Sequence, residues 1–259
     1  MRRCTVLGLA GHFLAALPPA ALADEAILLE GAVPFSRAIE VSDYSHPGRW
    51  TDTAWSRERV AQEDGAIVID LRPAEDPAAV GDKRFVSGEI RHRADVHYGR
   101  YEVVMQAAQG DGLNSAFFTY TGPHRGDPHD EIDFEFLGQD TTRVYINVFA
   151  DKRKMPGESV ALGFDAAAGP HLYAFEWLPD RVTWYADGRL LYQFAPEDIS
   201  RLPATPSQIY LSLWAGSPGI RGWLGLADPQ TTAEARYWCV SYVPLGGEGV
   251  QCSDRGYAD

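Results

Sequence analysis

Three acidic side chains recur at every second position in one short segment of the chain. Glu131, Asp133 and Glu135 alternate with apolar residues. Because successive side chains of a β-strand point to opposite faces, the three acids would share one face and the apolar residues the other. No Lys or Arg is interleaved to offset their repulsion. Crowded carboxyl groups have shifted pKa values, which a catalytic site uses and a purely structural strand does not need.

Cleavage of a glycosidic bond requires such a set of carboxyl groups. One protonated acid donates to the leaving oxygen, and one ionised acid attacks the anomeric carbon or activates water. A retaining mechanism needs the two groups about 5–5.5 Å apart, and two Glu side chains on a bent strand could lean together across Asp133. The spacing alone also fits a calcium site or an acidic strand that faces solvent.

Many further short strands are predicted around this segment. Asp187-Gly188 marks a tight hairpin, because both turn positions need a positive φ. Long helical periodicity is absent, and many short strands favour a sandwich or barrel over a parallel sheet. Residues 24–40 are expected to be a weakly structured lead-in. The predicted strands cover residues 66–71, 100–107, 115–121, 131–137, 144–149, 171–177, 182–185, 190–194, 209–214 and 233–243.

The composition is that of a globular, acidic protein. Of 259 residues, 45% are hydrophobic and 23% charged, which excludes wholesale disorder and a fibrous repeat. The formal net charge of −13 repels phosphate backbones, so no nucleic-acid partner is expected. Seven Trp, 12 Tyr and 11 Phe suit a core and also a surface that stacks on flat apolar faces.

The first 23 residues resemble an export signal. Arg2 and Arg3 precede a mostly apolar stretch over residues 6–22, and Ala21-Leu22-Ala23 fits the small-x-small cleavage rule. A membrane anchor is the alternative, but the stretch is interrupted by proline and short against the ~20 residues of a spanning helix. We therefore expect a signal peptide over 1–23, a single domain with a short tail over 24–259, no membrane insertion, and a periplasmic or extracellular location.

Two cysteines remain beyond the predicted signal. Cys239 and Cys252 lie close together in an exported chain, which predicts a disulfide between the last strand and the tail. Two free thiols are the alternative. Cys and His at zinc-ligand spacing are absent, so no metal site is predicted.

The acidic strand and its surroundings carry a family resemblance. The run from Pro128 to Gly138, with its Glu-x-Asp-x-Glu core, resembles glycoside hydrolase family 16. It is most similar to the bacterial β-1,3-1,4-glucanases (lichenases) and to relatives that trim bacterial exopolysaccharides. Matching segments recur in order from about Tyr44 to about Tyr242. They include residues 87–91, 98–102, 116–123, 140–144, 162–165, 171–177, 184–188 and 223–225.

The resemblance implies an all-β fold, a concanavalin A-like β-jelly-roll sandwich with a concave carbohydrate cleft. It also implies a retaining double displacement in which Glu131 is the nucleophile, Asp133 the assisting acid and Glu135 the general acid/base. The uninterrupted spacing matches the lichenase type, whereas members specific for β-1,3-glucan commonly carry one extra residue before the last Glu. No cofactor is implied for the chemistry, although relatives often hold a structural calcium.

The resemblance also carries over sugar-contact positions. Each aromatic residue among them has core packing as its alternative, and Trp177 and Trp184 are assigned to packing. The cleft positions are Tyr44, Glu89, Arg91, Phe118, Tyr120, Asn147, Phe149, Trp214 and Trp223.

Four positions depart from the Bacillus lichenase pattern, and all of them surround the predicted cleft. His129 stands in place of Trp, Ser212 of Asn, Phe149 of Tyr, and His46 of Asn. The His129 form is similar to the exopolysaccharide-processing relatives, so the expected substrate is a β-glucan or a bacterial exopolysaccharide. His129 is counted with the substrate-binding residues; a hydrogen bond to a catalytic carboxylate and simple packing are its alternatives.

Three functions remain open from the sequence. The first is an exported endo-β-glucanase, which would act as a monomer because the cleft needs no partner chain. The second is a transglycosylase that uses the same three acids to remodel a β-glucan. The third is a non-catalytic jelly-roll protein that only binds glycan; the three uncompensated acids argue against it.

Overall fold

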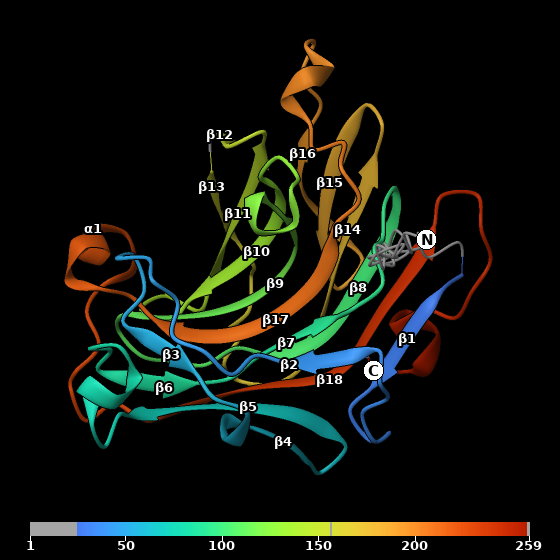
Figure 1. Ribbon diagram of the computed structural model, residues 1–259. Helices are drawn as coiled ribbons and strands as arrows, with labels where there is room; N and C mark the ends of the chain where they lie inside the picture. The colour runs from blue at the N-terminus through green and yellow to red at the C-terminus, as the bar shows by residue number, and fades with distance from the viewer. Residues whose placement is uncertain (1–24, 156, 258–259) are drawn as a thin grey trace, which may run out of the picture.

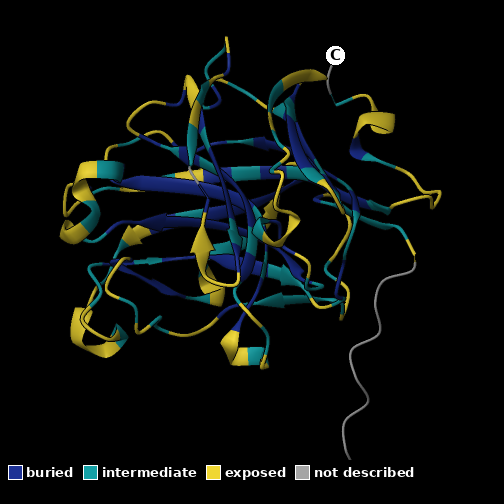
Figure 2. Ribbon diagram, turned by 90° about the horizontal axis from the view of Figure 1, so that it is seen from above, coloured by how far each residue is buried: buried dark blue, intermediate teal, exposed yellow. Residues whose placement is uncertain are grey.

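Two stacked β-sheets make up the protein in a computed structural model that describes residues 25–155 and 157–257 (Figure 1). The predicted all-β sandwich is confirmed. The predicted signal peptide, residues 1–23, lies outside the described residues. Buried residues line the middle of the strands where the sheets meet, and exposed residues gather in the connecting loops (Figure 2).

The first sheet has ten strands among the described residues. They are β1 (Ile27–Glu30), β3 (Thr53–Trp55), β4 (Val60–Glu63), β5 (Ala66–Pro73), β6 (Phe85–Ser87), β8 (Gly99–Gln106), β14 (His171–Leu178), β15 (Arg181–Ala186), β16 (Arg189–Phe194) and β18 (Ala233–Pro244). Their order is β16-β15-β14-β8-β18-β5-β6-β3, with β1 beside β18 and β4 beside β5. β3 and β6 pair in parallel, and the other pairs in this sheet are antiparallel.

The second sheet has eight described strands and carries the three acids. They are β2 (Ile39–Val41), β7 (Glu89–His92), β9 (Leu113–Thr121), β10 (Asp130–Leu137), β11 (Arg143–Ala150), β12 (Arg153–Lys154), β13 (Glu158–Ala161) and β17 (Gln208–Ala215). Their order is β12-β11-β10-β9-β17-β7-β2, with β13 beside β11. β10 therefore lies between β9 and β11, away from both edges of the sheet.

Helical structure is confined to short connections. The helices in the described ranges are η1 (Arg57–Arg59), η2 (Pro77–Val80), η3 (Pro123–Arg125), η4 (Ile199–Arg201), η5 (Pro218–Ile220), α1 (Arg221–Leu224) and η6 (Cys252–Arg255). None of these described helices is long and apolar enough to cross a membrane.

All ten predicted strands are present, and the predicted hairpin between β15 and β16 has positive φ at both Asp187 and Gly188. The expectation of a weakly structured lead-in is wrong. β1 pairs with β18 from Ile27 opposite Tyr242 to Glu30 opposite Cys239, and β2 pairs with β7. Each of these short strands owes its structure to a partner far away in the sequence.

The hydrophobic core between the two sheets packs against the inner face of β10, the strand that carries the three acids. Ile132, Phe134 and Phe136 of β10 are completely buried in it, as their alternation with the acids predicts. Trp184 of β15, also buried, donates its indole N–H to the backbone carbonyl of Asp133 at 3.1 Å. The two sheets are therefore tied together directly beneath the central acid, and the assignment of Trp177 and Trp184 to packing is confirmed.

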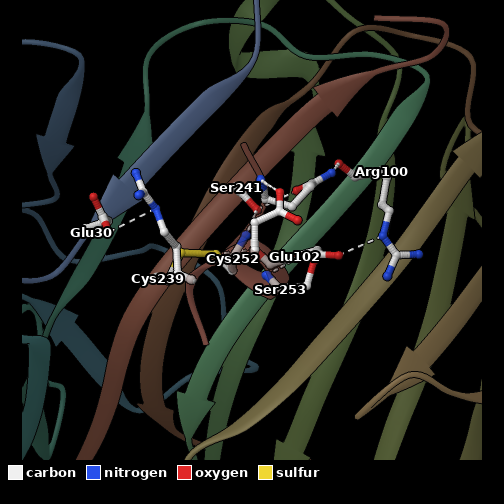
Figure 3. Close-up of a disulfide and its surroundings, with 10 residues drawn as sticks. Glu30, Arg100, Glu102, Cys239, Ser241, Cys252 and Ser253 are labelled. Atoms are coloured by element: carbon white, nitrogen blue, oxygen red, sulfur yellow. Dashed lines mark hydrogen bonds and ion pairs between the residues drawn. A yellow bond between two sulfur atoms is a disulfide. The ribbon is translucent and has the colours of Figure 1, made fainter. Parts of the chain in front are cut away.

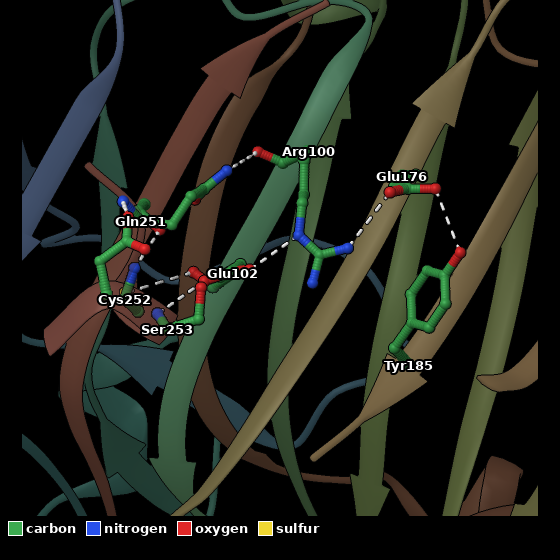
Figure 4. Close-up of polar contacts among 9 residues, drawn as sticks. Arg100, Glu102, Glu176, Tyr185, Gln251, Cys252 and Ser253 are labelled. Atoms are coloured by element: carbon green, nitrogen blue, oxygen red, sulfur yellow. Dashed lines mark hydrogen bonds and ion pairs between the residues drawn. The ribbon is translucent and has the colours of Figure 1, made fainter. Parts of the chain in front are cut away.

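The C-terminal tail is fixed on the outside of the ten-stranded sheet. The predicted disulfide is present between Cys239 and Cys252 (Figure 3). Beside it, the backbone N–H of Ser253 donates to the buried carboxylate of Glu102 at 2.8 Å, and Arg100 donates to the other oxygen at 2.7 Å. Arg100 continues the network to Glu176, which also accepts from the Tyr185 hydroxyl (Figure 4).

Removing this disulfide should destabilise the protein without changing its fold. The double variant Cys239→Ala/Cys252→Ala opens a loop with a sequence separation of 13 residues, which costs about 3 kcal/mol in the loop-entropy model. For a domain of this size that corresponds to a fall in Tm of roughly 6–12 °C. Thermal unfolding followed by circular dichroism measures it, with reduced wild type as the comparison. An unchanged Tm would show that hydrogen bonds alone hold the tail.

Candidate active site

The three acids of β10 lie at the centre of rows of side chains that run across the eight-stranded sheet. Glu131 lies opposite Tyr120 on β9 and Phe149 on β11. Neither pairing contains a register shift along β10, so the acids keep strict alternation on one face.

The next two rows bring the remaining predicted positions beside the acids. Asp133 lies between Phe118 and Asn147, and that row continues through Tyr210 to Arg91. The row of Glu135 runs through Ser212 to Glu89, with Tyr145 on its other side. The structure thus gathers the predicted acids and strand residues on a single face of one sheet.

Two of the three acids have pKa values that are raised above their usual range. Burial and the neighbouring carboxylates raise the pKa of Asp133 well above its usual range. Burial, followed by the charge of Glu131, raises the pKa of Glu135 to about 8, although a hydrogen bond from Asn114 at 2.9 Å opposes the shift. At pH 7 a protonated Glu135 therefore stands near Glu131.

Glu131 is held by hydrogen bonds on both sides. Asp133 hydrogen-bonds to it, and this bond helps to raise the pKa of Asp133. His129 lies on the other side, with Nε2 2.6 Å from Oε2 of Glu131. The polar edge of His129 is thus turned to a carboxylate, which was one of the alternatives left open for this residue.

A cation missed by the sequence analysis also faces the acids. The ammonium group of Lys154, on β12, lies 5.3 Å from the ring centre of Tyr145 and 5.8 Å from that of Phe149. Its charge lowers the pKa of both Asp133 and Glu135 and so moderates the effect of burial. The cation comes from a two-residue strand paired with Phe149, not from β10. No signal in the sequence of β10 could have revealed it.

On β7, where these rows end, the buried acid Glu89 lies near Arg91 and near tyrosine side chains. Glu89 is buried and accepts from the Ser42 hydroxyl at 2.7 Å, and burial raises its pKa to about 7. Burial, with Glu89 as the next cause, raises the pKa of Tyr44 to about 12, which places its hydroxyl near that acid. Arg91 donates to Glu40 at 2.8 Å.

The expectation that Trp214 presents an open ring is wrong. Trp214 is only 7% exposed, because Trp50 contacts it edge-on at 4.9 Å and Trp223 lies 6.2 Å away. Trp50 is 41% exposed and was missed from the sequence. It lies between strands, where alternation gives no information on exposure. Of these two indole rings, that of Trp50 is therefore the one exposed to solvent.

A pocket of about 460 Å³ opens at the C-terminal end of β10, where Leu137 lines it. Tyr145, directly opposite Glu135, lines it together with Leu137, Arg143 and Trp223. The Trp223 ring meets that of Tyr145 edge-on at 5.5 Å, and its indole N–H is buried with no hydrogen-bond partner among the described residues. Flat rings with polar groups at the rim suit a sugar, whose faces are apolar and whose edge carries hydroxyls.

The residues present do not form an obvious metal site. In the two described ranges, no group of three or more His, Cys, Asp or Glu side chains is arranged to hold a metal ion. Cleavage of a glycosidic bond by two carboxyl groups uses the chain's own side chains.

The chain matches known proteins over most of its length. The family model for glycosyl hydrolases family 16 covers residues 48–237. A beta-glucanase from Acetivibrio thermocellus is 38% identical over 209 residues, which are 80% of this chain and 59% of that protein. The chain thus spans well under two thirds of this relative.

Solved structures agree in fold. The Bacillus licheniformis beta-glucanase is 34% identical with a TM-score of 0.77, covering 85% of this chain and 98% of that one. A beta-1,3-1,4-glucanase (lichenase) derived from a mouse hindgut metagenome is 33% identical with a TM-score of 0.79, covering 85% and 99%. These matches confirm the jelly-roll sandwich. With the family model covering more than half of the sequence, the chain belongs to glycosyl hydrolases family 16.

Proposed function

We propose that this protein is an exported endo-β-glucanase that hydrolyses internal bonds of a mixed-linkage β-1,3-1,4-glucan or a similar bacterial exopolysaccharide. The proposal rests mainly on Glu135, whose carboxyl group has a pKa of about 8 and lies on the same face of β10 as Glu131. The regular register of β10 supports a lichenase-type specificity, and relatives named as beta-glucanases support the substrate class. Export is proposed from the N-terminal signal pattern, and a monomer from a site built by one chain.

The proposed reaction is a double displacement with retention. Glu131 attacks the anomeric carbon while Glu135 protonates the leaving oxygen, giving a glycosyl ester on Glu131. Esterification removes the charge of Glu131, which is the second largest cause of the raised pKa of Glu135. The pKa of Glu135 then falls, so Glu135 can take a proton from the water that cleaves the ester.

The remaining cleft residues would bind the polymer. We assign sugar contacts to Tyr44, Glu89, Arg91, Phe118, Tyr120, Asn147, Phe149 and Trp223, and to Trp50 in place of the covered Trp214. Asn147 supports the assignment, because its amide oxygen is buried opposite Asp133 without a hydrogen-bond partner among the described residues. A sugar hydroxyl would supply that partner. The pocket at the C-terminal end of β10 would take the leaving-group side of the chain.

The test is to incubate residues 24–259 separately with mixed-linkage glucan, laminarin and a succinoglycan-type polymer. Reducing ends and chain length are followed together. Rapid shortening of the mixed-linkage glucan or the exopolysaccharide supports the proposal. Transfer to added sugar acceptors in preference to water would indicate a transglycosylase, and binding without cleavage would indicate a glycan-binding protein.

A further inference from the structure

The ring of His129 is fixed by three contacts from three strands. Its Nε2 lies 2.6 Å from Oε2 of Glu131 on β10. Its face stacks on Phe149 of β11 at 4.7 Å and 19°, and Tyr120 of β9 meets it edge-on at 5.2 Å and 84°. Its backbone carbonyl also accepts from the Lys152 N–H at 3.0 Å. Few orientations of the imidazole satisfy all of these contacts.

The contact with Glu131 requires one proton between Nε2 and Oε2, and we assign it to Nε2 because an attacking Glu131 is ionised. Two bare acceptors at 2.6 Å would repel each other, whereas an N–H that donates to a carboxylate makes a short, charge-assisted hydrogen bond. Asp133 hydrogen-bonds to the same carboxylate. Glu131 is therefore held between two donors, one of which comes from outside the acidic motif.

We propose that His129 is a positioning residue for the nucleophile: its Nε2–H, aimed by Phe149 and Tyr120, holds Glu131 in the attacking orientation and stabilises its negative charge. The inference rests on the proposed function, since it assumes that Glu131 attacks the substrate. From the sequence, His129 is counted with the substrate-binding residues. The proposal gives it another role, because the ring nitrogen that was expected to contact a sugar contacts the nucleophile instead.

Two variants of His129 and one matched control separate the donor from the ring. His129→Phe keeps a ring against Phe149 and removes the donor, while His129→Gln keeps a donor. We expect His129→Phe to lower kcat about 10- to 100-fold, the range for a hydrogen bond to a charged group. KM should change less than about threefold. His129→Gln should recover most of the loss. The control is His124→Phe, because His124 stacks on the same Tyr120 at 5.6 Å without bonding to Glu131.

A measurement on the resting protein keeps the inference independent of turnover. In ¹⁵N-labelled protein, the imidazole signals of His129 should show Nε2 protonated and should shift when Glu131→Gln is introduced. Wild-type kcat in His129→Phe, no recovery in His129→Gln, or signals that ignore Glu131→Gln would each overturn the positioning role. If wild type cleaves no β-glucan while the signals respond to Glu131, the proposed function fails and the contact stands.

Discussion

Replacing Glu131 with alanine should lower kcat on a β-glucan by on the order of 10⁵-fold, because no covalent intermediate can form without the nucleophile. Binding of the polymer should persist, since the cleft walls and the core beneath β10 are untouched. Reducing-end release and affinity electrophoresis on the same preparation measure the two properties. The control is Glu63→Gln, an exposed acid on β4 of the other sheet.

Azide distinguishes this role of Glu131 from a general loss of structure. The small anion can enter the space vacated in Glu131→Ala and attack the anomeric carbon from the same side. With an activated aryl glycoside, one displacement instead of two should give an α-glycosyl azide. Glu135→Ala should give no α-product with azide. An active Glu131→Ala variant, or the same azide product from both variants, would contradict the assignment of the nucleophile.

Replacing Glu135 with glutamine should lower kcat/KM on natural glucan by about 10²–10⁴-fold, the usual contribution of a general acid. The wild-type profile should decline as the pH rises through about 8, because Glu135 is protonated below its raised pKa and ionised above it. In Glu135→Gln that alkaline limb should disappear. Initial rates between pH 5 and 10 on wild type and variant test both statements.

The leaving group provides the control for Glu135. An aryl glycoside with a very acidic phenol needs no proton to depart, so Glu135→Gln should form the glycosyl-enzyme from it at nearly the wild-type rate. A pre-steady-state burst of phenol would show this. An alkaline limb that survives in Glu135→Gln, or equal losses on both kinds of substrate, would show that another group supplies the proton.

The long strands and the acidic face could be predicted from the sequence because their information is local. Alternation places Glu131, Asp133 and Glu135 on one side of β10 whatever its neighbours are. The hairpin at Asp187-Gly188 likewise depends on two residues and their φ angles. The order of matching segments then supplied the partners on β9, β11 and β17, and the structure brings them into facing rows.

The features that escaped prediction depend on long-range packing. β1 is a four-residue strand that forms only against β18, more than 200 residues away. Lys154 reaches the acids through a two-residue strand, and Trp50 covers Trp214 from a connection between β2 and β3. Such contacts are fixed by how sheets and loops pack, which neither periodicity nor composition encodes.

The stereochemistry of the first product distinguishes a double displacement, with Glu131 as nucleophile and Glu135 as acid and base, from a single displacement. Proton NMR can follow the anomeric signals of the new reducing ends released from mixed-linkage β-glucan before mutarotation. We expect the β-anomer to appear first and the α-anomer to grow in later. If the α-anomer appears first, the bond is cleaved by a single displacement, and Glu131 is not the nucleophile.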